Sequence, residues 1–266
     1  MKNWDQVEED SGRCQADRDW DDVQRVCDRL GIQRQRINFV HEYWTEVFET
    51  MLAEFKRGVT PNPDIVCNRE IKFKALFEKA TELGFSHVAT GHYCRVGVAA
   101  DGSGPSLLRG LDETKDQAYF LGAIGRQALG RTLFPIGHLR KTEVKRLARE
   151  HGLVEVAERP ESMGICFIGK RRFEDFIGQY LQQVPGELRL ADGTVVGPHR
   201  GLCTLTIGQG AKIGGRPEKL FVFSKDVPRN IIYVTPGRSA WNSAFFLLHF
   251  FFLFFSFFLN WRVHDI

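Results

Sequence analysis

The chain has 266 residues, with 36 Lys and Arg against 33 Asp and Glu. A chain of this length can bury a sizeable core in one large domain or two smaller ones. The near balance of charge excludes a general binder of polyanions, and the basic segments 141–149 and 170–172 are solvated helix faces or local nucleic-acid contacts.

Helical and strand patterns alternate along residues 1–183. Apolar residues recurring every three or four positions predict helices at 19–30, 43–56, 68–83 and 141–152, and a further helix begins at 117–121. Short apolar runs predict strands at 37–40, 85–90 and 107–111. This alternation predicts an incomplete catalytic domain of the α/β class over 1–183, built on a doubly wound parallel sheet.

From residue 184 the pattern changes to short strands between turns rich in glycine and proline. The strands are expected at 187–196, 202–207, 220–223 and 231–234. They predict a small β-rich second domain over 184–237.

The last segment, 238–266, fits neither pattern. No Asp, Glu, Lys or Arg occurs from Ser239 to Trp261, as in a membrane span. A pyrimidine-rich stretch of messenger, read through as protein, would also give this content of Phe, Leu and Ser. Read-through is the favoured interpretation, because membrane spans usually mix Leu, Ile, Val, Ala and Gly, and nothing else in the chain suggests a membrane.

A stiff turn, Thr60-Pro-Asn-Pro-Asp64, precedes Cys67. Each proline fixes φ and holds the residue before it extended. The helix is therefore expected to begin near Asn68, where its positive end favours the thiolate of Cys67. Cys67 is a candidate reactive thiol or a buried structural cysteine. Asp64 is a candidate acid or base, or the cap of the helix.

The six cysteines are spread along the chain, at positions 14, 27, 67, 94, 166 and 203. They lack the CxxC or Cys/His spacing of a zinc site, so no metal centre is predicted. A reducing compartment and one or two reactive thiols fit this spacing better than a disulfide framework does.

Six motifs occur in order along residues 1 to about 237. They are Met1-Lys-Asn-Trp4, the segment from Thr60 to Asn68, Ala89-Thr-Gly-His-Tyr93, Lys115-Asp-Gln117, Glu161-Ser-Met-Gly-Ile-Cys166-Phe-Ile-Gly169 and Thr206-Ile-Gly-Gln209. Together they resemble the tRNA-specific 2-thiouridylases, in the mitochondrial form found in animals. That family belongs to the ATP pyrophosphatases, whose catalytic domain is HUP-like.

The resemblance implies a reaction on the wobble uridine of certain tRNAs. ATP, with Mg²⁺, adenylates O2 of the uridine, and a cysteine persulfide then delivers sulfur to C2. Cys166 matches the persulfide carrier and Cys67 its partner thiol, and the two are implied to form a disulfide afterwards. A sulfur-donor protein, a monomeric enzyme and a mitochondrial location are also implied.

Other positions take their implied roles from the same motifs. Met1 and Gly91 match residues that bind the nucleotide, and Asn62, Pro63 and Asp64 match residues that contact the target base. The positions that match tRNA-binding residues are His92, Lys115, Asp116, Gln117 and Gln209. For His92 the alternative is a polar residue satisfied within the fold.

The sequence departs from the family at several points. It contains no Ser-Gly-Gly-x-Asp-Ser segment, the loop that holds the phosphates of ATP, and Gly210 stands where the family usually has arginine. The family's carboxy-terminal barrel is replaced by the Phe-rich tail. The resemblance therefore predicts a chain truncated at both ends, without the first strand, that does not thiolate tRNA as written. The alternative is a non-catalytic remnant that binds tRNA or a sulfur carrier.

Overall fold

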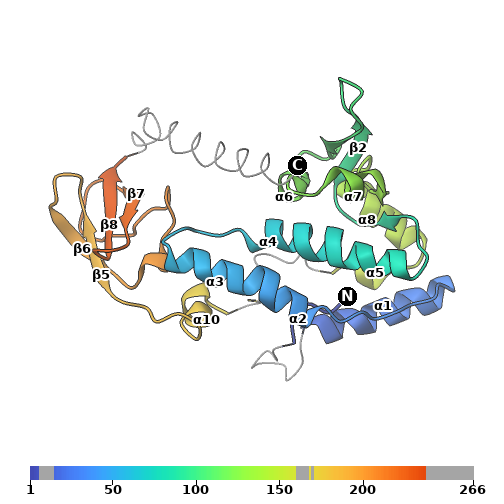
Figure 1. Cartoon of the computed structure of the whole chain (residues 1–266), viewed down its shortest axis with the longest axis horizontal. Coiled ribbons are helices and arrows are strands. Elements are labelled where there is room, and N and C mark those ends of the chain that lie inside the picture. Colours follow the sequence, from blue (N-terminus) through green and yellow to red (C-terminus); the bar gives the residue numbers. More distant parts are fainter. Residues whose placement is uncertain (6–14, 160–167, 169–170, 238–266) are drawn as a thin grey trace. The chain divides into compact units, whose positions relative to one another are not determined.

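The computed structural model describes residues 1–5, 15–159, 168 and 171–237 (Figure 1). The chain divides into two compact units. The first contains Met1–Met51 and Asn62–Arg172, and the second contains Leu52–Pro61 and the described residues from Phe173 onward. The Phe-rich segment 238–266, Cys14 and Cys166 lie outside the described residues.

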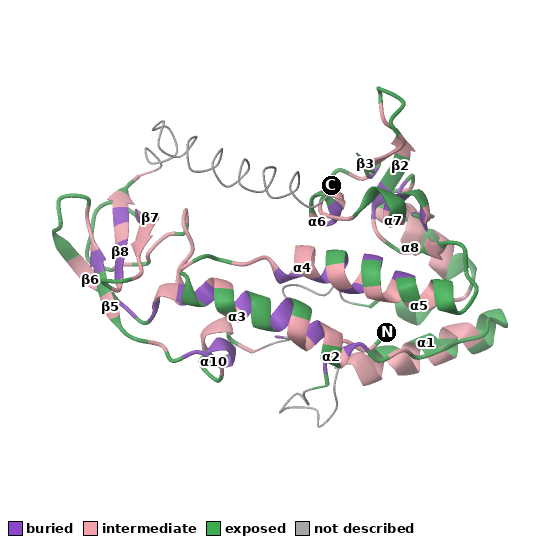
Figure 2. Ribbon diagram, viewed as in Figure 1, coloured by how far each residue is buried: buried purple, intermediate pink, exposed green. Residues whose placement is uncertain are grey.

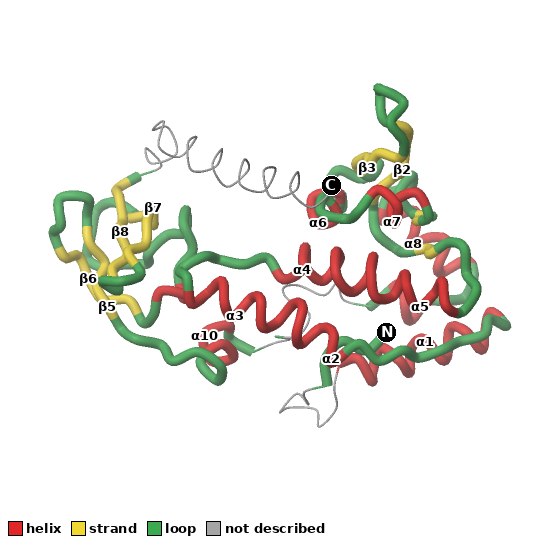
Figure 3. The backbone as a smooth tube through the Cα atoms, viewed as in Figure 1, coloured by secondary structure: helices red, strands yellow, loops and turns green. Residues whose placement is uncertain are grey.

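Helices dominate the first unit (Figure 3). They are α1 (Gln15–Leu30), α2 (Val40–Glu42), η1 (Tyr43–Phe48), α3 (Glu49–Lys56), α4 (Pro63–Val66), η2 (Cys67–Ala75), α5 (Leu76–Glu82), α6 (Ala118–Leu121), α7 (Arg126–Gly130), α8 (Lys141–Glu150) and α9 (Val154–Ala157). The part of α3 from Leu52 onward belongs to the second unit. The elements α2, η1 and α3 follow one another without a break, as do α4, η2 and α5. The four long helices expected from the sequence are therefore present, with shifted ends.

The largest shift is at the helix that carries Cys67, which begins at Pro63 and not near Asn68. Asn62 is extended (φ −116°, ψ 90°), and its Oδ1 accepts a hydrogen bond from Ile65 N at 3.3 Å. Proline suits the first helical position because its missing N–H would have no partner there. Asn62 is therefore the cap, and the expectation that Asp64 caps this helix is wrong.

Two strand pairs complete the first unit. The parallel pair is β1 (Val88–Ala89) with β4 (Thr132–Leu133), and the antiparallel pair is β2 (Cys94–Val98) with β3 (Pro105–Arg109). The expected strand 37–40 is reduced to one parallel bridge between Lys2 and Asn38. The α/β class with parallel pairing is confirmed, whereas the β2–β3 hairpin was not expected.

One part of the core of this unit lies between the helix 63–82 and the segments after β1, and another part is formed by buried residues of η1 and α3 such as Val47 and Phe48. The buried cluster in the first of these parts consists of Phe73, Cys94, Leu121, Leu129 and Phe134. Buried residues alternate with exposed ones along α4, η2 and α5, as an amphipathic helix requires (Figure 2). The helix therefore presents one face, which includes Cys67 and Ile71, to the protein interior.

The second unit is a four-stranded sheet with the strand order β6-β5-β8-β7. Its elements are α10 (Phe173–Ile177), β5 (Gly186–Arg189), β6 (Val195–His199), η3 (Leu202–Thr204), β7 (Leu220–Asp226) and β8 (Ile231–Pro236). Strands β5 and β8 are parallel and the other pairs are antiparallel. The β-rich character of this unit is confirmed.

Two strands expected in the second unit are wrong. Residues 187–196 form a hairpin, because Asp192 and Gly193 turn the chain and Gly193 takes φ +90°, which glycine adopts readily. Residues 202–207 form a short helical turn and a loop. Leu202, Leu205 and Ile207 are apolar because they pack from this loop on the core of the second unit. That core cluster consists of Leu188, Leu220, Val222, Ile232 and Val234.

No helix among the described residues is long and apolar enough to cross a membrane.

Candidate active site

Cys67 lies in the second turn of the helix that Asn62 caps, and its side chain is 5% exposed. Its backbone N–H already donates to carbonyls of the first turn, those of Pro63 and Asp64. The sequence had placed this thiol at the mouth of the helix. That expectation is wrong, because the unpaired N–H groups of a helix belong to its first turn and here lie before Cys67.

Asp64 lies one turn before Cys67 and is half-buried. Burial raises the pKa of its carboxyl, and the positive charge of Lys72 opposes the rise. A carboxyl with a raised pKa exchanges protons closer to neutral pH, as a general acid or base requires. The electrostatics of Asp64 therefore suit proton transfer, a role that the sequence alone left open beside capping.

Asn3 brings the start of the chain to Cys67. Its Nδ2 lies 4.0 Å from Cys67 Sγ. Met1, two residues earlier, is 44% exposed, and burial lowers the pKa of its amine, with a smaller contribution from Arg36. The segments Met1–Asn3 and Asn62–Cys67 therefore meet in one region, although about sixty residues separate them.

A second pair of motifs meets after β1. The backbones of Tyr93 and Gln117 are joined by the hydrogen bond from Gln117 N to Tyr93 O at 3.1 Å, and Gln117 Oε1 accepts from Tyr93 N at 3.0 Å. Asp116 Oδ1 accepts from Gly110 N at 2.8 Å. The structure thus places residues 115–117 beside 91–93. The side-chain oxygens of Asp116 and Gln117 bond backbone groups there, and tRNA contact by these residues stays a prediction.

The helix that carries Cys67 links the two regions. Asn68 Nδ2 donates to Phe120 O at 3.0 Å, three residues after Gln117. The rings of Phe73 and His92 lie 5.9 Å apart. The positive charge of Lys72 contributes a lowering of the pKa at both Asp64 and His92, although burial raises the pKa of Asp64 overall. These two groups therefore share one electrostatic neighbour. Sequence reasoning missed Lys72, Asn3 and Asn68 as site residues, although Asn3 and Asn68 lie inside the motifs.

His92 is partly buried after β1, where its Nδ1 pairs with Thr90 Oγ1 at 2.9 Å. Burial, with a contribution from Lys72, lowers its pKa to about 4. Its imidazole is therefore neutral near pH 7. A neutral imidazole can contact a base or a hydroxyl, but it supplies no positive charge to a phosphate.

We expect His92 to make the chain sensitive to acid. Between pH 6.5 and about 4 the unfolded chain binds a proton at this histidine and the folded chain does not. The free energy of unfolding therefore falls as the pH drops through this window, by about 2 kcal/mol after allowance for partial exposure. Urea titrations at pH 7 and pH 4.5 would measure this loss.

The variant His92→Gln removes the titrating group and should lose less stability over the same interval. His87→Gln is the matched control, because His87 is exposed and its ring pairs with the hydroxyl of its neighbour Ser86 at 3.0 Å. Equal acid sensitivity in the wild type and His92→Gln would contradict the prediction.

Gln209 belongs to the second unit. Its Oε1 accepts a hydrogen bond from Thr206 N at 2.9 Å, and its own N–H donates to Thr206 O at 2.9 Å. These bonds close a turn between β6 and β7. The side-chain oxygen of Gln209 thus has a structural role in this turn, and contact of Gln209 with tRNA stays a prediction.

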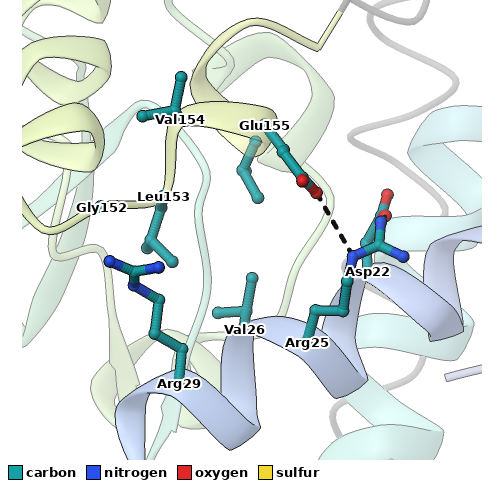
Figure 4. A pocket seen from close by; sticks show the side chains of 9 residues that line it. Asp22, Arg25, Val26, Arg29, Gly152, Leu153, Val154 and Glu155 are labelled. Carbon is teal, nitrogen blue, oxygen red and sulfur yellow. Dashed lines mark hydrogen bonds and ion pairs between the residues drawn. The ribbon is translucent and has the colours of Figure 1, made fainter.

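The cavity in Figure 4 contains none of the predicted site residues. It has a volume of about 310 Å³ and lies between α1 and the segment 152–156, with Arg25 paired to Glu155 at 3.4 Å across it (Figure 4). Within the described part of the chain, no group of His, Cys, Asp or Glu could hold a metal ion. The site therefore rests on the residues around Cys67 and His92.

Comparison with known proteins gives matches over both units. The family model described as the tRNA methyl transferase HUP domain matches residues 1–170, and the model described as the tRNA methyl transferase PRC-barrel domain matches residues 174–236. Three curated relatives carry the name tRNA-specific 2-thiouridylase MnmA. They come from Vibrio vulnificus (48% identical), Stutzerimonas stutzeri (52%) and Bacillus licheniformis (49%).

These alignments cover 89 to 90% of this chain and 63 to 66% of the relatives. The chain thus spans slightly less than two thirds of the length of the proteins that it resembles.

Proposed function

We propose that this chain acts as a tRNA 2-thiouridylase, because it belongs to the family that joins a tRNA methyl transferase HUP domain to a PRC-barrel domain. The relatives named as 2-thiouridylases are about half identical to it. The observation that carries the proposal is the placement of Asp64 and Cys67 one turn apart on a capped helix, with Asn3 at the sulfur. A carboxyl with a raised pKa beside a thiol suits proton and sulfur transfer.

In the proposed reaction, O2 of the uridine attacks ATP, releases pyrophosphate and becomes bound to AMP. The outer sulfur of a persulfide on Cys166 then attacks C2, and AMP leaves with the oxygen. The Cys67 thiolate attacks the inner sulfur, which breaks the persulfide bond and forms the Cys67–Cys166 disulfide. The outer sulfur stays on C2 of the uridine. Asp64 would move a proton on or off the base.

The nucleotide is proposed to approach Met1 and Gly91. Among the described residues, a Cβ added at Gly91 would meet only Ile136 Cδ1, at 4.0 Å, so packing against these residues does not require glycine there. A ligand that passes close to the backbone would explain it. We place Mg²⁺ with ATP as part of the substrate.

The tRNA is proposed to contact Asn62 and Pro63 at the base, and His92, the segment 115–117 and Gln209 elsewhere. His92 and 115–117 support a common surface, since Tyr93 and Gln117 are hydrogen-bonded to each other. A persulfide-carrying donor protein and a monomeric state complete the proposal, together with a mitochondrial location. Fractionation of cells that express the chain would test the location.

Thiolation of tRNA by the purified chain tests the function. The chain is incubated with unmodified tRNA, ATP, Mg²⁺ and a small-molecule persulfide, which passes its outer sulfur to Cys166 and leaves as a thiolate. The 2-thiouridine formed is measured by mass spectrometry of the digested RNA. We expect product that depends on ATP, whereas the departures from the family motifs predict none, so this assay decides between the two expectations. Absence of product, with the chain folded, would contradict the proposal.

The second candidate is a chain that binds tRNA or a sulfur carrier without turnover. It is favoured by one feature, the absence of a Ser-Gly-Gly-x-Asp-Ser segment from the sequence. Calorimetric titration with ATP separates the two, because the thiouridylase must bind ATP. Binding of tRNA without binding of ATP would support the second candidate.

A further inference from the structure

Asn3 places a side-chain donor at Cys67. The amide N–H of Asn3 donates toward Sγ, with 4.0 Å between nitrogen and sulfur. Asn68, the residue after Cys67, donates instead to Phe120 O at 3.0 Å. The 4.0 Å between Asn3 Nδ2 and Cys67 Sγ is long for a hydrogen bond to a neutral thiol. A sulfur anion attracts an N–H donor more strongly and shortens such a contact.

The backbone on both sides of Asn3 is held by other elements. Lys2 N donates to Ile37 O at 2.8 Å, and Lys2 O accepts from Phe39 N at 2.7 Å. On the other side the ring of Trp4 packs at 5.1 Å from that of Phe48. Asn3 therefore reaches Cys67 from a fixed backbone position.

The other end of the same amide has no partner. Oδ1 of Asn3 is buried and makes no hydrogen bond to any described residue. An unpaired buried carbonyl destabilises a fold, and an apolar side chain of the same size would avoid that cost. Packing alone therefore does not explain an amide here, whereas a donor for the sulfur does.

We propose that Asn3 is a positioning residue for Cys67: its amide N–H stabilises the sulfur anion and fixes the direction of Sγ. The use of this anion in sulfur transfer rests on the function proposed above. The contact itself requires neither tRNA nor ATP. The charged groups on the elements concerned include Asp64 and Lys72 on the helix, and the Met1 amine and Arg36 near the bridge. All of them are kept in the variants below.

The pH dependence of alkylation of Cys67 tests the proposal. The full chain is treated with iodoacetamide across pH 6 to 10, and each cysteine is followed separately by peptide mass spectrometry. Asn3→Asp keeps the shape but sets a carboxylate against the sulfur. The midpoint of the curve of alkylation rate against pH should move to higher pH for Cys67. Its alkylation at pH 7 should become about tenfold slower or more. Asn3→Ala should shift the midpoint in the same direction by less.

Two references accompany the variants. Cys27 is a free cysteine on α1, an element that takes no part in the Asn3–Cys67 hydrogen bond, and its alkylation should be unchanged throughout. Asn38→Ala is the matched control, because exposed Asn38 belongs to the same bridge as Lys2 and its Oδ1 bonds Val40 N at 3.0 Å. It should leave the midpoint for Cys67 where it is in the wild type.

Unchanged midpoints in folded Asn3→Asp and Asn3→Ala would overturn the proposal. A midpoint moved to lower pH would also overturn it, because the amide oxygen would then be facing an S–H group. Circular dichroism reports whether each variant is folded. If Asn3→Asp does not fold, the comparison of Asn3→Ala with Asn3→Ser, which restores a shorter donor, decides the sign. If the Asn3 variants show the shift but the wild type makes no 2-thiouridine, the proposed function is refuted and this inference stands.

Discussion

Replacement of Cys67 by serine is expected to abolish formation of 2-thiouridine, with a fall of about 10³-fold or more in the rate. Serine keeps the size of the side chain but cannot form the disulfide that ends the proposed sulfur transfer. Because Cys67 is only 5% exposed and sits within a continuous helix, the substitution should leave the fold and the affinity for tRNA nearly unchanged. Product is measured by mass spectrometry and tRNA binding by filter retention.

Cys203→Ser is the matched control. Cys203 is also buried, and its Sγ donates to Gln183 Oε1 at 2.9 Å. A serine hydroxyl can make the same hydrogen bond, so this variant should keep its activity. Equal activity of the wild type and Cys67→Ser would show that Cys67 takes no part in the chemistry.

Replacement of Asp64 by asparagine is expected to lower the rate of thiolation by about 10²- to 10⁴-fold, the range for loss of a general acid or base. The same variant should be more stable than the wild type at pH 7. Burial raises the pKa of this carboxyl, so the folded chain holds the proton to higher pH than the unfolded chain does. The contribution of Asp64 to stability is therefore greatest at low pH. It falls as the pH rises from 3.8 through the raised pKa.

At neutral pH the wild type keeps a partly desolvated carboxylate that Asp64→Asn does not. Urea titrations at pH 4 and pH 7, beside the thiolation assay, would measure both effects. Asp101→Asn is the control, for which the expected change in stability at pH 7 has the opposite sign. Asp101 is fully exposed, and hydrogen bonds from Ser103 lower its pKa, so its loss should slightly reduce stability at pH 7 without affecting the rate. A less stable Asp64→Asn with full activity would contradict both expectations.

Much of the fold follows from local patterns, and the errors have local causes. The helix 63–82 starts five residues early because Asn62 and Asp64 are both good caps, and Pro63 at the first helical position decides between them. The hairpin of β2 and β3 was missed although apolar residues alternate along 94–98, because the run is short and Gly97 within it weakens the strand signal. The apolar run at 202–207 was mistaken for a strand because burial alone does not distinguish a strand from a packed loop.

The sequence by itself predicted which residues carry the proposed chemistry, because the motifs are local and ordered: Asp64 and Cys67 on one helix, His92 after a strand, and Gln117 at the start of another helix. It also determined the α/β class and the β-rich second unit. Only the tertiary structure decided that Asn3 meets Cys67, that Lys72 acts on both Asp64 and His92, and that Leu52–Pro61 belongs with the second unit. Local patterns are set by backbone preferences and by periodic burial within one element. Contacts between distant segments depend on how whole elements pack, which neither sequence spacing nor propensity specifies.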